Sequence, residues 1–329
     1  MKSSNIGGQA VLEGIMMKNG DRYAVAVRKP DKEIAVNVQE YHSVMPWETI
    51  RRVPFIRGIF NFVDSAALGI KALMFSASFF EEETETDAEE LSEQEVKKQE
   101  RKEKLLMNLT LAVSFVLAIG IFMILPYFLS NFVQKVVTSR WVITILEGVI
   151  RVLIFLGYIA LVSRMEDIQR TFMYHGAEHK CINCIEHGLE LNVENVRKSS
   201  RQHKRCGTSF LFFVMIVSII FCFFITAESQ MIRVVLRIVL LPFIAGVSYE
   251  IIRLAGNSEN WIVNLLSKPG LLIQNMTTKE PDDSMIEVAI QAVEAVFDWK
   301  AYEAENFGAV YSTQKEQKQK EQTEKGVVL

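Results

Sequence analysis

Residues 105–129 read LLMNLTLAVSFVLAIGIFMILPYFL, a stretch of 25 positions without a charged side chain. At about 1.5 Å per residue, a helix of this length exceeds the hydrocarbon core of a bilayer, which is about 30 Å thick. Three further segments are largely apolar: 209–227, which is also uncharged, 141–163, which contains Glu147 and Arg151, and 234–252, which contains Arg237 and Glu250. The sequence therefore predicts a mainly α membrane protein built on a bundle of four transmembrane helices.

Lysine and arginine concentrate between the second and third of these segments, where residues 164–207 contain eight of them. Cytoplasmic loops retain basic residues, so we expect a multi-pass protein of the cell membrane with this loop and both termini in the cytoplasm. The lipid bilayer is the expected partner. A net charge of −3 argues against nucleic-acid binding, which needs a concentrated cationic surface. The sequence leaves the substrate and the oligomeric state open.

The chain outside the bundle has its own patterns. Residues 24–27 and 34–38 flank a Lys-Pro-Asp-Lys turn signal at 29–32, which predicts a β-hairpin. Residues 55–80 are apolar with one polar stripe, which favours an interfacial amphipathic helix over a fifth span. Pro-Asp-Asp-Ser at 281–284 is a helix-start signal, and the pattern after it predicts an amphipathic helix of roughly five turns.

These patterns divide the chain into six consecutive parts. They are a β-containing segment 1–54, the interfacial helix 55–80, a charged linker 81–104, a membrane domain 105–256 with the cytoplasmic loop 164–207, a C-terminal cytoplasmic segment 257–304, and a disordered tail 305–329.

The segment His175-Gly176-Ala177-Glu178-His179 carries the most specific chemistry. On a helix the two imidazoles lie about 40° apart, and Glu178 lies about 60° from His175. This H-x-x-E-H order is the inverzincin arrangement, in which two imidazoles bind a metal and the carboxylate takes a proton from metal-bound water. The alternative is an ordinary interfacial helix with surface imidazoles. We expect a divalent metal site, with zinc as the first choice.

Two helical ligands do not complete a metal site, so a third must come from elsewhere. Glu250 is one candidate, because a carboxylate in the last span is costly unless it is paired or metal-bound. A salt bridge with Arg253 is the alternative. His203 and Cys206 precede the third span, at the membrane face where the second span ends, and they are further candidates.

Two other groups have competing interpretations. Cys181 and Cys184, together with His203 and Cys206, have a spacing compatible with structural zinc, although buried thiols are the simpler interpretation. Glu147 and the arginine one helical turn later, Arg151, can pair within the second span. Such a pair marks either a proton or substrate path or a structural contact.

Several motifs resemble one protein family. They are IGGQAVLEGIMM at 6–17, YHGAEHK at 174–180, RCGTSF at 205–210, LPFIAGVSYE at 241–250 and TTKEPDD at 277–283. Together they resemble the YqhQ-like family of bacterial membrane proteins, described as predicted metal-dependent enzymes, and the resemblance extends from about residue 5 to residue 300. The first motif looks like a tight glycine turn that presents Glu13 near the same site.

The sequence thus leads to three hypotheses. The preferred one is a membrane-embedded metal-dependent hydrolase with Glu178 as general base. The second is a non-enzymatic scaffold or assembly protein in which a metal is structural. The third is a small transporter or lipid-handling protein that uses Glu147 and Arg151.

Overall fold

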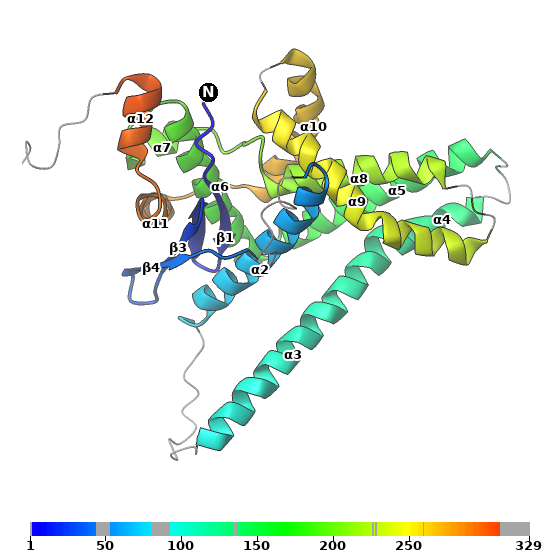
Figure 1. The fold of residues 1–329 in the computed structure, drawn as a ribbon, viewed down its shortest axis with the longest axis horizontal. Helices are drawn as coiled ribbons and strands as arrows, with labels where there is room; N and C mark the ends of the chain where they lie inside the picture. Colours follow the sequence, from blue (N-terminus) through cyan, green and yellow to red (C-terminus); the bar gives the residue numbers. More distant parts are fainter. Residues whose placement is uncertain are drawn as a thin grey trace, which may run out of the picture. The chain divides into compact units, whose positions relative to one another are not determined.

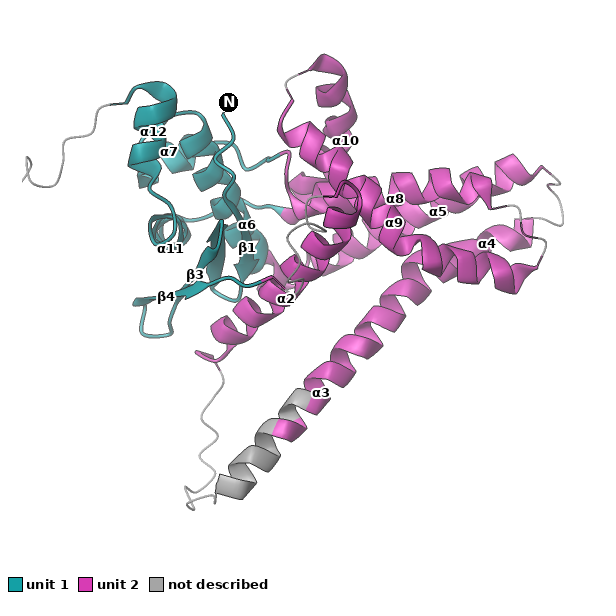
Figure 2. Cartoon of the chain, viewed as in Figure 1, with its two compact units in different colours: residues 1–42, 170–203, 278–329 teal, residues 43–169, 204–277 magenta. Residues whose placement is uncertain are grey.

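The computed structural model describes residues 2–43, 53–80, 93–133, 137, 139–225, 227, 229–258 and 260–309. Part of the predicted linker, 81–92, and most of the predicted disordered tail, 310–329, lie outside the described residues. The chain forms two compact units (Figure 2). Unit 1 comprises Met1–His42, Arg170–His203 and Thr278–Leu329, and unit 2 comprises Ser43–Gln169 and Lys204–Thr277.

Unit 1 contains a four-stranded antiparallel sheet, shown in blue in Figure 1. Its strands pair in chain order: β1 (Gly7–Val11), β2 (Gly14–Asn19), β3 (Arg22–Arg28) and β4 (Ile34–Glu40). The last two strands are the predicted hairpin, which is confirmed. The first two replace the predicted glycine turn, because Gly7 and Gly8 lie within β1 and the turn falls at Leu12 and Glu13.

Four helices complete unit 1. They are α6 (Glu166–Glu186), whose first turn belongs to unit 2, α7 (Val193–Lys198), α11 (Asp283–Glu294) and α12 (Trp299–Phe307). Helix α11 begins where the sequence predicted, since the Asp282 side chain caps the amide of Met285 at 2.9 Å, but it is shorter than five turns. It packs on β2 and β3, and buried residues of α6 join the same core.

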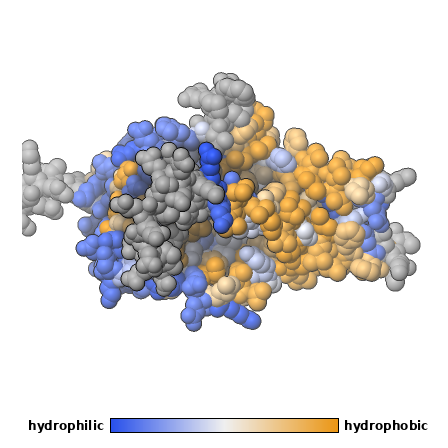
Figure 3. All heavy atoms as spheres, turned by 90° about the horizontal axis from the view of Figure 1, so that it is seen from below, coloured by the Kyte–Doolittle hydropathy of each residue, from blue (hydrophilic) through white to orange (hydrophobic). Residues whose placement is uncertain are grey.

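Unit 2 consists of helices. They are α2 (Ile56–Ala77), α3 (Glu93–Ile119), the π-helical turn η1 (Gly120–Ile124), α4 (Leu125–Val133), α5 (Arg140–Val162), α8 (Gly207–Phe224), α9 (Gln230–Gly256) and α10 (Trp261–Thr277). Among the described residues, five helical stretches are long and apolar enough to cross a membrane. Four of them, 105–133, α5, α8 and α9, match the predicted spans to within a few residues. Figure 3 shows the apolar side chains that cover much of this unit.

The predicted count of four membrane helices is not matched, because among the described residues α2 also meets the length and composition of a span. Its polar stripe does not face water alone. Arg57 binds Glu250 of α9, and the Asn61 amide donates to the Tyr249 hydroxyl at 2.8 Å. The two helices can approach closely because Gly58 has no side chain. A Cβ at this position would lie 2.6 Å from the Cβ of Tyr249. Helix α2 therefore satisfies two groups of its polar stripe by packing on α9.

Candidate functional site

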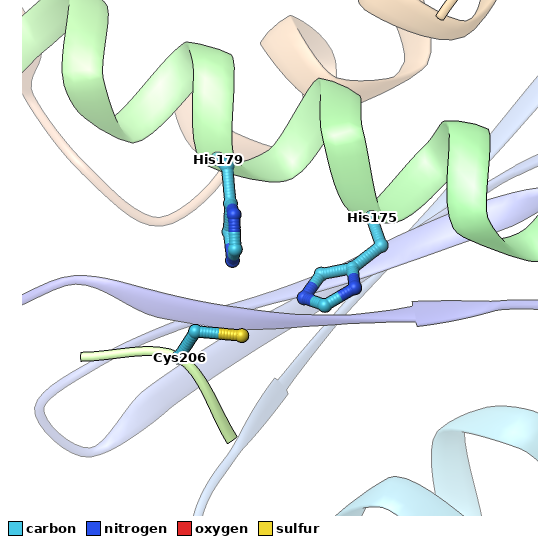
Figure 4. Close-up of side chains that lie close together, drawn as sticks. All are labelled: His175, His179 and Cys206. Atoms are coloured by element: carbon cyan, nitrogen blue, oxygen red, sulfur yellow. The ribbon is translucent and has the colours of Figure 1, made fainter. Parts of the chain in front are cut away.

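The predicted ligand pair lies on α6. His175 and His179 project from the same face of this helix, one turn apart, as Figure 4 shows. Their ring centroids are 4.4 Å apart, His175 is half-buried and His179 is buried. The helical placement that the H-x-x-E-H spacing predicted is confirmed. Two imidazoles at this separation can both direct a nitrogen to one ion.

The orientation of His179 is fixed by the chain that follows α7. Its Nδ1 lies 2.6 Å from the Arg201 carbonyl oxygen, and since a carbonyl only accepts, Nδ1 donates the proton. In the neutral ring, Nε2 then carries the lone pair. The Asn183 amide reinforces this arrangement by donating to the carbonyls of Ser200 at 2.6 Å and Gln202 at 2.9 Å. Metal-binding histidines typically have such a backbone partner on their second nitrogen.

His203 belongs to the same cluster. Its ring centroid is 5.8 Å from that of His179, and its Nε2 lies 3.4 Å from Oε2 of the fully buried Glu186. The Ser4 amide and hydroxyl donate to the other carboxylate oxygen at 2.8 and 2.9 Å. Glu186 lies seven residues past His179 on an unbroken helix, so it positions His203 rather than joining the two ligands of α6. Only the fold brings this pair together.

Glu178 lies between the two ligands and is buried. Its Oε1 accepts from the Gly8 amide at 3.2 Å, and Gly8 can approach this closely because it has no side chain: a Cβ there would lie 2.9 Å from Glu178 Cγ. Burial raises the pKa of Glu178, while the electrostatic influence of the neighbouring His175 and the Gly8 hydrogen bond act in the opposite direction. A carboxyl group with a raised pKa exchanges protons more readily near neutral pH.

Glu13 has a partner of its own. It occupies the β1–β2 turn with a positive φ of 47°, and its carboxylate pairs with Arg170, where Nη2 lies 2.5 Å from Oε2. The Tyr174 hydroxyl is 3.4 Å from the same oxygen, and burial raises the pKa of that tyrosine. Glu13 therefore ties the sheet to the first turns of α6.

The four cysteines are all buried and form no disulfide. Cys181 and Cys184 are buried in the hydrophobic core of unit 1. Burial raises the pKa of Cys184 to about 12, so this sulfur is a thiol at neutral pH. Cys206, also labelled in Figure 4, belongs to unit 2, where it caps α8 by accepting from the Thr208 amide at 3.4 Å.

The predicted site residues of unit 2 have protein partners. Glu250 accepts from Arg57 Nε at 2.7 Å and from the Phe55 amide at 3.1 Å, so its ion-pair partner is Arg57 of α2 and not the neighbouring Arg253. The pairing of Glu147 with Arg151 is confirmed at 2.8 Å. A third member, Arg237 of α9, binds both oxygens of Glu147 at 2.6 and 2.8 Å, and no local pattern in the sequence indicates this contact.

The described residues thus define a class of protein that combines five long apolar helices with a compact unit containing buried histidines. Residues 53–299 match the family described as "Protein of unknown function (DUF1385)", and the chain belongs to this family.

The chain is 35% identical over 305 residues to the "Uncharacterized protein YqhQ" of Bacillus subtilis (strain 168), covering 91% of this chain and 94% of that protein. The resemblance drawn from the sequence motifs is thereby confirmed. No solved structure matches the chain.

Proposed function

We propose that unit 1 is the metal-binding part of a membrane-embedded hydrolase, with His175 and His179 as two of the ligands. The observation that carries this proposal is the hydrogen bond from His179 Nδ1 to the Arg201 carbonyl. It presets the tautomer a ligand needs, beside a second imidazole 4.4 Å away. A nitrogen-rich set of this kind suits zinc, and manganese or iron are the alternatives.

The third ligand comes from the segment that follows the Arg201 contact. His203 is already next to His179, and Cys206 lies three residues further on. Since three residues span at most about 11 Å, the chain itself keeps Cys206 within reach. Glu250 is the weaker choice, because Arg57 neutralises it.

Hydrolysis is the proposed reaction. A bound divalent ion supplies a water that ionises near neutral pH. Glu178, as a carboxylate, would accept the proton that this water loses and pass it to the leaving group, so one water would be consumed and the carboxylate regenerated. The Gly8 hydrogen bond to Oε1 holds the carboxylate in place for both transfers.

The assembly of unit 1 from three chain segments supports a membrane topology with four crossings. Its three chain segments share one core, so all three must lie on the same side of the bilayer. Helices α8 and α9 separate the second segment from the third. Between the first and the second lie α2, 105–133 and α5, of which an even number must cross. Helix α2 is the least apolar of the five, and we propose that it does not cross.

The same topology places unit 1 in the cytoplasm. Its middle segment belongs to the lysine- and arginine-rich region between α5 and α8, and such loops remain on the cytoplasmic side. Both termini are then cytoplasmic, and the apolar helices of unit 2 lie in the lipid of the cell membrane.

Metal analysis tests the proposal. The protein would be purified in detergent without a histidine tag, and bound metal quantified by mass spectrometry. We expect about one equivalent in the wild type and in His42→Ala, which removes an exposed imidazole of unit 1. We expect loss of the metal in His175→Ala/His179→Ala. Equal metal in the double variant, or none in the wild type after reconstitution with zinc, manganese and iron, contradicts the proposal.

One observation favours a second function, a scaffold in which the metal is structural. The Glu178 carboxylate is bound to the β1 backbone, which is what a structural carboxylate does. Glu178→Gln distinguishes a hydrolase from a scaffold, because the amide oxygen still accepts from Gly8 but the side chain no longer takes a proton. A hydrolase with this change keeps its metal and loses turnover in a substrate screen, whereas a scaffold keeps all its functions.

A further inference from the structure

The buried charges of unit 2 do not balance. Glu147 accepts from both Arg151 and Arg237, so one carboxylate faces two guanidinium groups. All three residues are less than a tenth exposed. Arg151 also donates to the Ser218 hydroxyl, and Arg237 lies 4.3 Å above the centre of the Tyr127 ring. Within an apolar bundle an uncompensated positive charge is costly, so an anion is the natural complement.

Two cavities meet at this cluster. One, of about 390 Å³, is lined almost entirely by apolar side chains, with Arg151 and Arg237 at its wall. The other, of about 520 Å³, is polar and is lined by Arg140, Arg233 and Tyr127 among others. Both are lined by Arg237 and Cys222. Across the two linings the described charged residues are four arginines and one glutamate.

Buried donors at the cluster lack partners. Within the described part of the chain, Nε of Arg151, Nε of Arg237 and the Tyr127 hydroxyl are buried and form no hydrogen bond. Each belongs to a residue that lines one of the two cavities. A buried donor without an acceptor is destabilising, so these three groups point to an acceptor-rich ligand.

We propose that the two cavities form one binding site for a lipid phosphate. The phosphate binds the arginines and Tyr127 in the polar cavity, and an acyl chain occupies the apolar one. An amphiphile fits because a purely polar anion would leave the apolar cavity empty, and an apolar ligand would leave the excess positive charge of Arg151 and Arg237, which share Glu147, uncompensated. The polar cavity is lined by the last residues of α4 and the first turns of α5 and α9, so in the proposed topology it lies at the outer end of the bundle.

Calorimetry on the full-length protein in a neutral detergent tests this site. The probes are short-chain phosphatidic acid, phosphatidylcholine with the same chains, and inorganic phosphate. We expect phosphatidic acid to bind at least tenfold more tightly than either of the others. Equal binding of phosphatidylcholine would show that the arginines do not select an anion. Equal binding of inorganic phosphate would show that the apolar cavity does not contribute. Either result overturns the proposal.

Substitutions locate the site. Arg237→Gln and Arg233→Gln should each weaken phosphatidic acid binding about tenfold or more, and Tyr127→Phe should weaken it by a smaller factor. If Arg237→Gln fails to fold, Arg233→Gln and Tyr127→Phe still test the prediction. The matched control is Arg253→Gln, which removes an exposed arginine of α9 that lines neither cavity. Equal affinities in Arg233→Gln, Tyr127→Phe and the control overturn the proposal.

Discussion

The histidine cluster of unit 1 and the arginine cluster of unit 2 are both buried and polar, but they are held in different ways. In unit 1 the backbone supplies partners for two of the buried side chains, whereas His203 meets the Glu186 carboxylate. His179 donates to the Arg201 carbonyl, and Lys180 Nζ donates to the carbonyls of Arg197 and Ser199, both at 2.9 Å. In unit 2 side chains bind side chains across α5, α8 and α9, and some donors are left over.

The difference shows what each cluster needs. Backbone partners are fixed by the fold, so the imidazoles of unit 1 are preorganised before any ion binds. Arg151 and Arg237 of unit 2 share one partner, Glu147. They also need an acceptor that the described chain does not supply. The first cluster should therefore tolerate a change at one member, whereas the second should respond as a whole.

The largest effect is expected at Glu147. Glu147→Gln removes the charge that Arg151 and Arg237 share, which leaves two buried guanidinium groups uncompensated. Breaking a buried pair in this way costs about 3 to 5 kcal/mol. Thermal unfolding in detergent should show a fall in melting temperature of at least about 6 °C. Glu166→Gln, at the exposed start of α6, is the control, and an equal melting temperature in both variants would contradict the prediction.

A smaller effect is expected where α6 meets the segment before α11. Gly176 lies between the two histidines, and a Cβ at this position would lie 2.0 Å from the Lys279 carbonyl oxygen. Gly176→Ala must therefore displace backbone, at a cost of about 1 to 3 kcal/mol. The matched control is Gly157→Ala in α5, where a Cβ meets nothing within 4 Å. In a denaturant titration, Gly176→Ala should unfold at a lower midpoint than Gly157→Ala. Similar midpoints would refute the steric argument.

The sequence predicted those features that depend only on residues close together in the chain. The apolar helices could be predicted because long runs of apolar residues, such as the 25 uncharged positions 105–129, are typical of membrane spans. The H-x-x-E-H spacing could be interpreted because it lies within one helix. The position of α11 followed from its own cap at Asp282. Each of these signals is local, so no knowledge of the fold was needed.

What the sequence could not predict depends on contacts between distant residues. Arg237 reaches Glu147 across 90 positions, and Glu186 meets His203 and Ser4 only after α6 and the N-terminal segment have folded together. The polar stripe of 55–80 indicated an interfacial helix, because nothing in the segment shows that Glu250 would neutralise Arg57. Unit 1 itself, assembled from three separate segments, has no local signature.

Alkaline pH should act on unit 1 through its core thiols. The pKa of Cys184 rises from its usual 9.0 to about 12 because the thiol is buried. Above pH 9 the unfolded chain loses this proton and the folded chain keeps it, so stability falls as pH rises. The slope is about 1.4 kcal/mol per pH unit between these two values. Cys184→Ala should remove that slope from the wild-type curve, as followed by fluorescence of the buried Trp299. Parallel curves above pH 9 would show that this thiol does not contribute.

The smallest effect is expected at the exposed ion pair of unit 1, Arg197 with Asp283, where Arg197 Nε donates to the carboxylate at 2.9 Å. Both side chains are more than half exposed, so water and salt screen the attraction and the coupling should be small. A double-mutant cycle with Arg197→Ala and Asp283→Ala measures it. The same cycle on Glu147 and Arg151, which are almost fully buried, should give a several-fold larger value. Equal coupling energies would mean that burial does not set the strength of these pairs, and the contrast between the two clusters would fail with it.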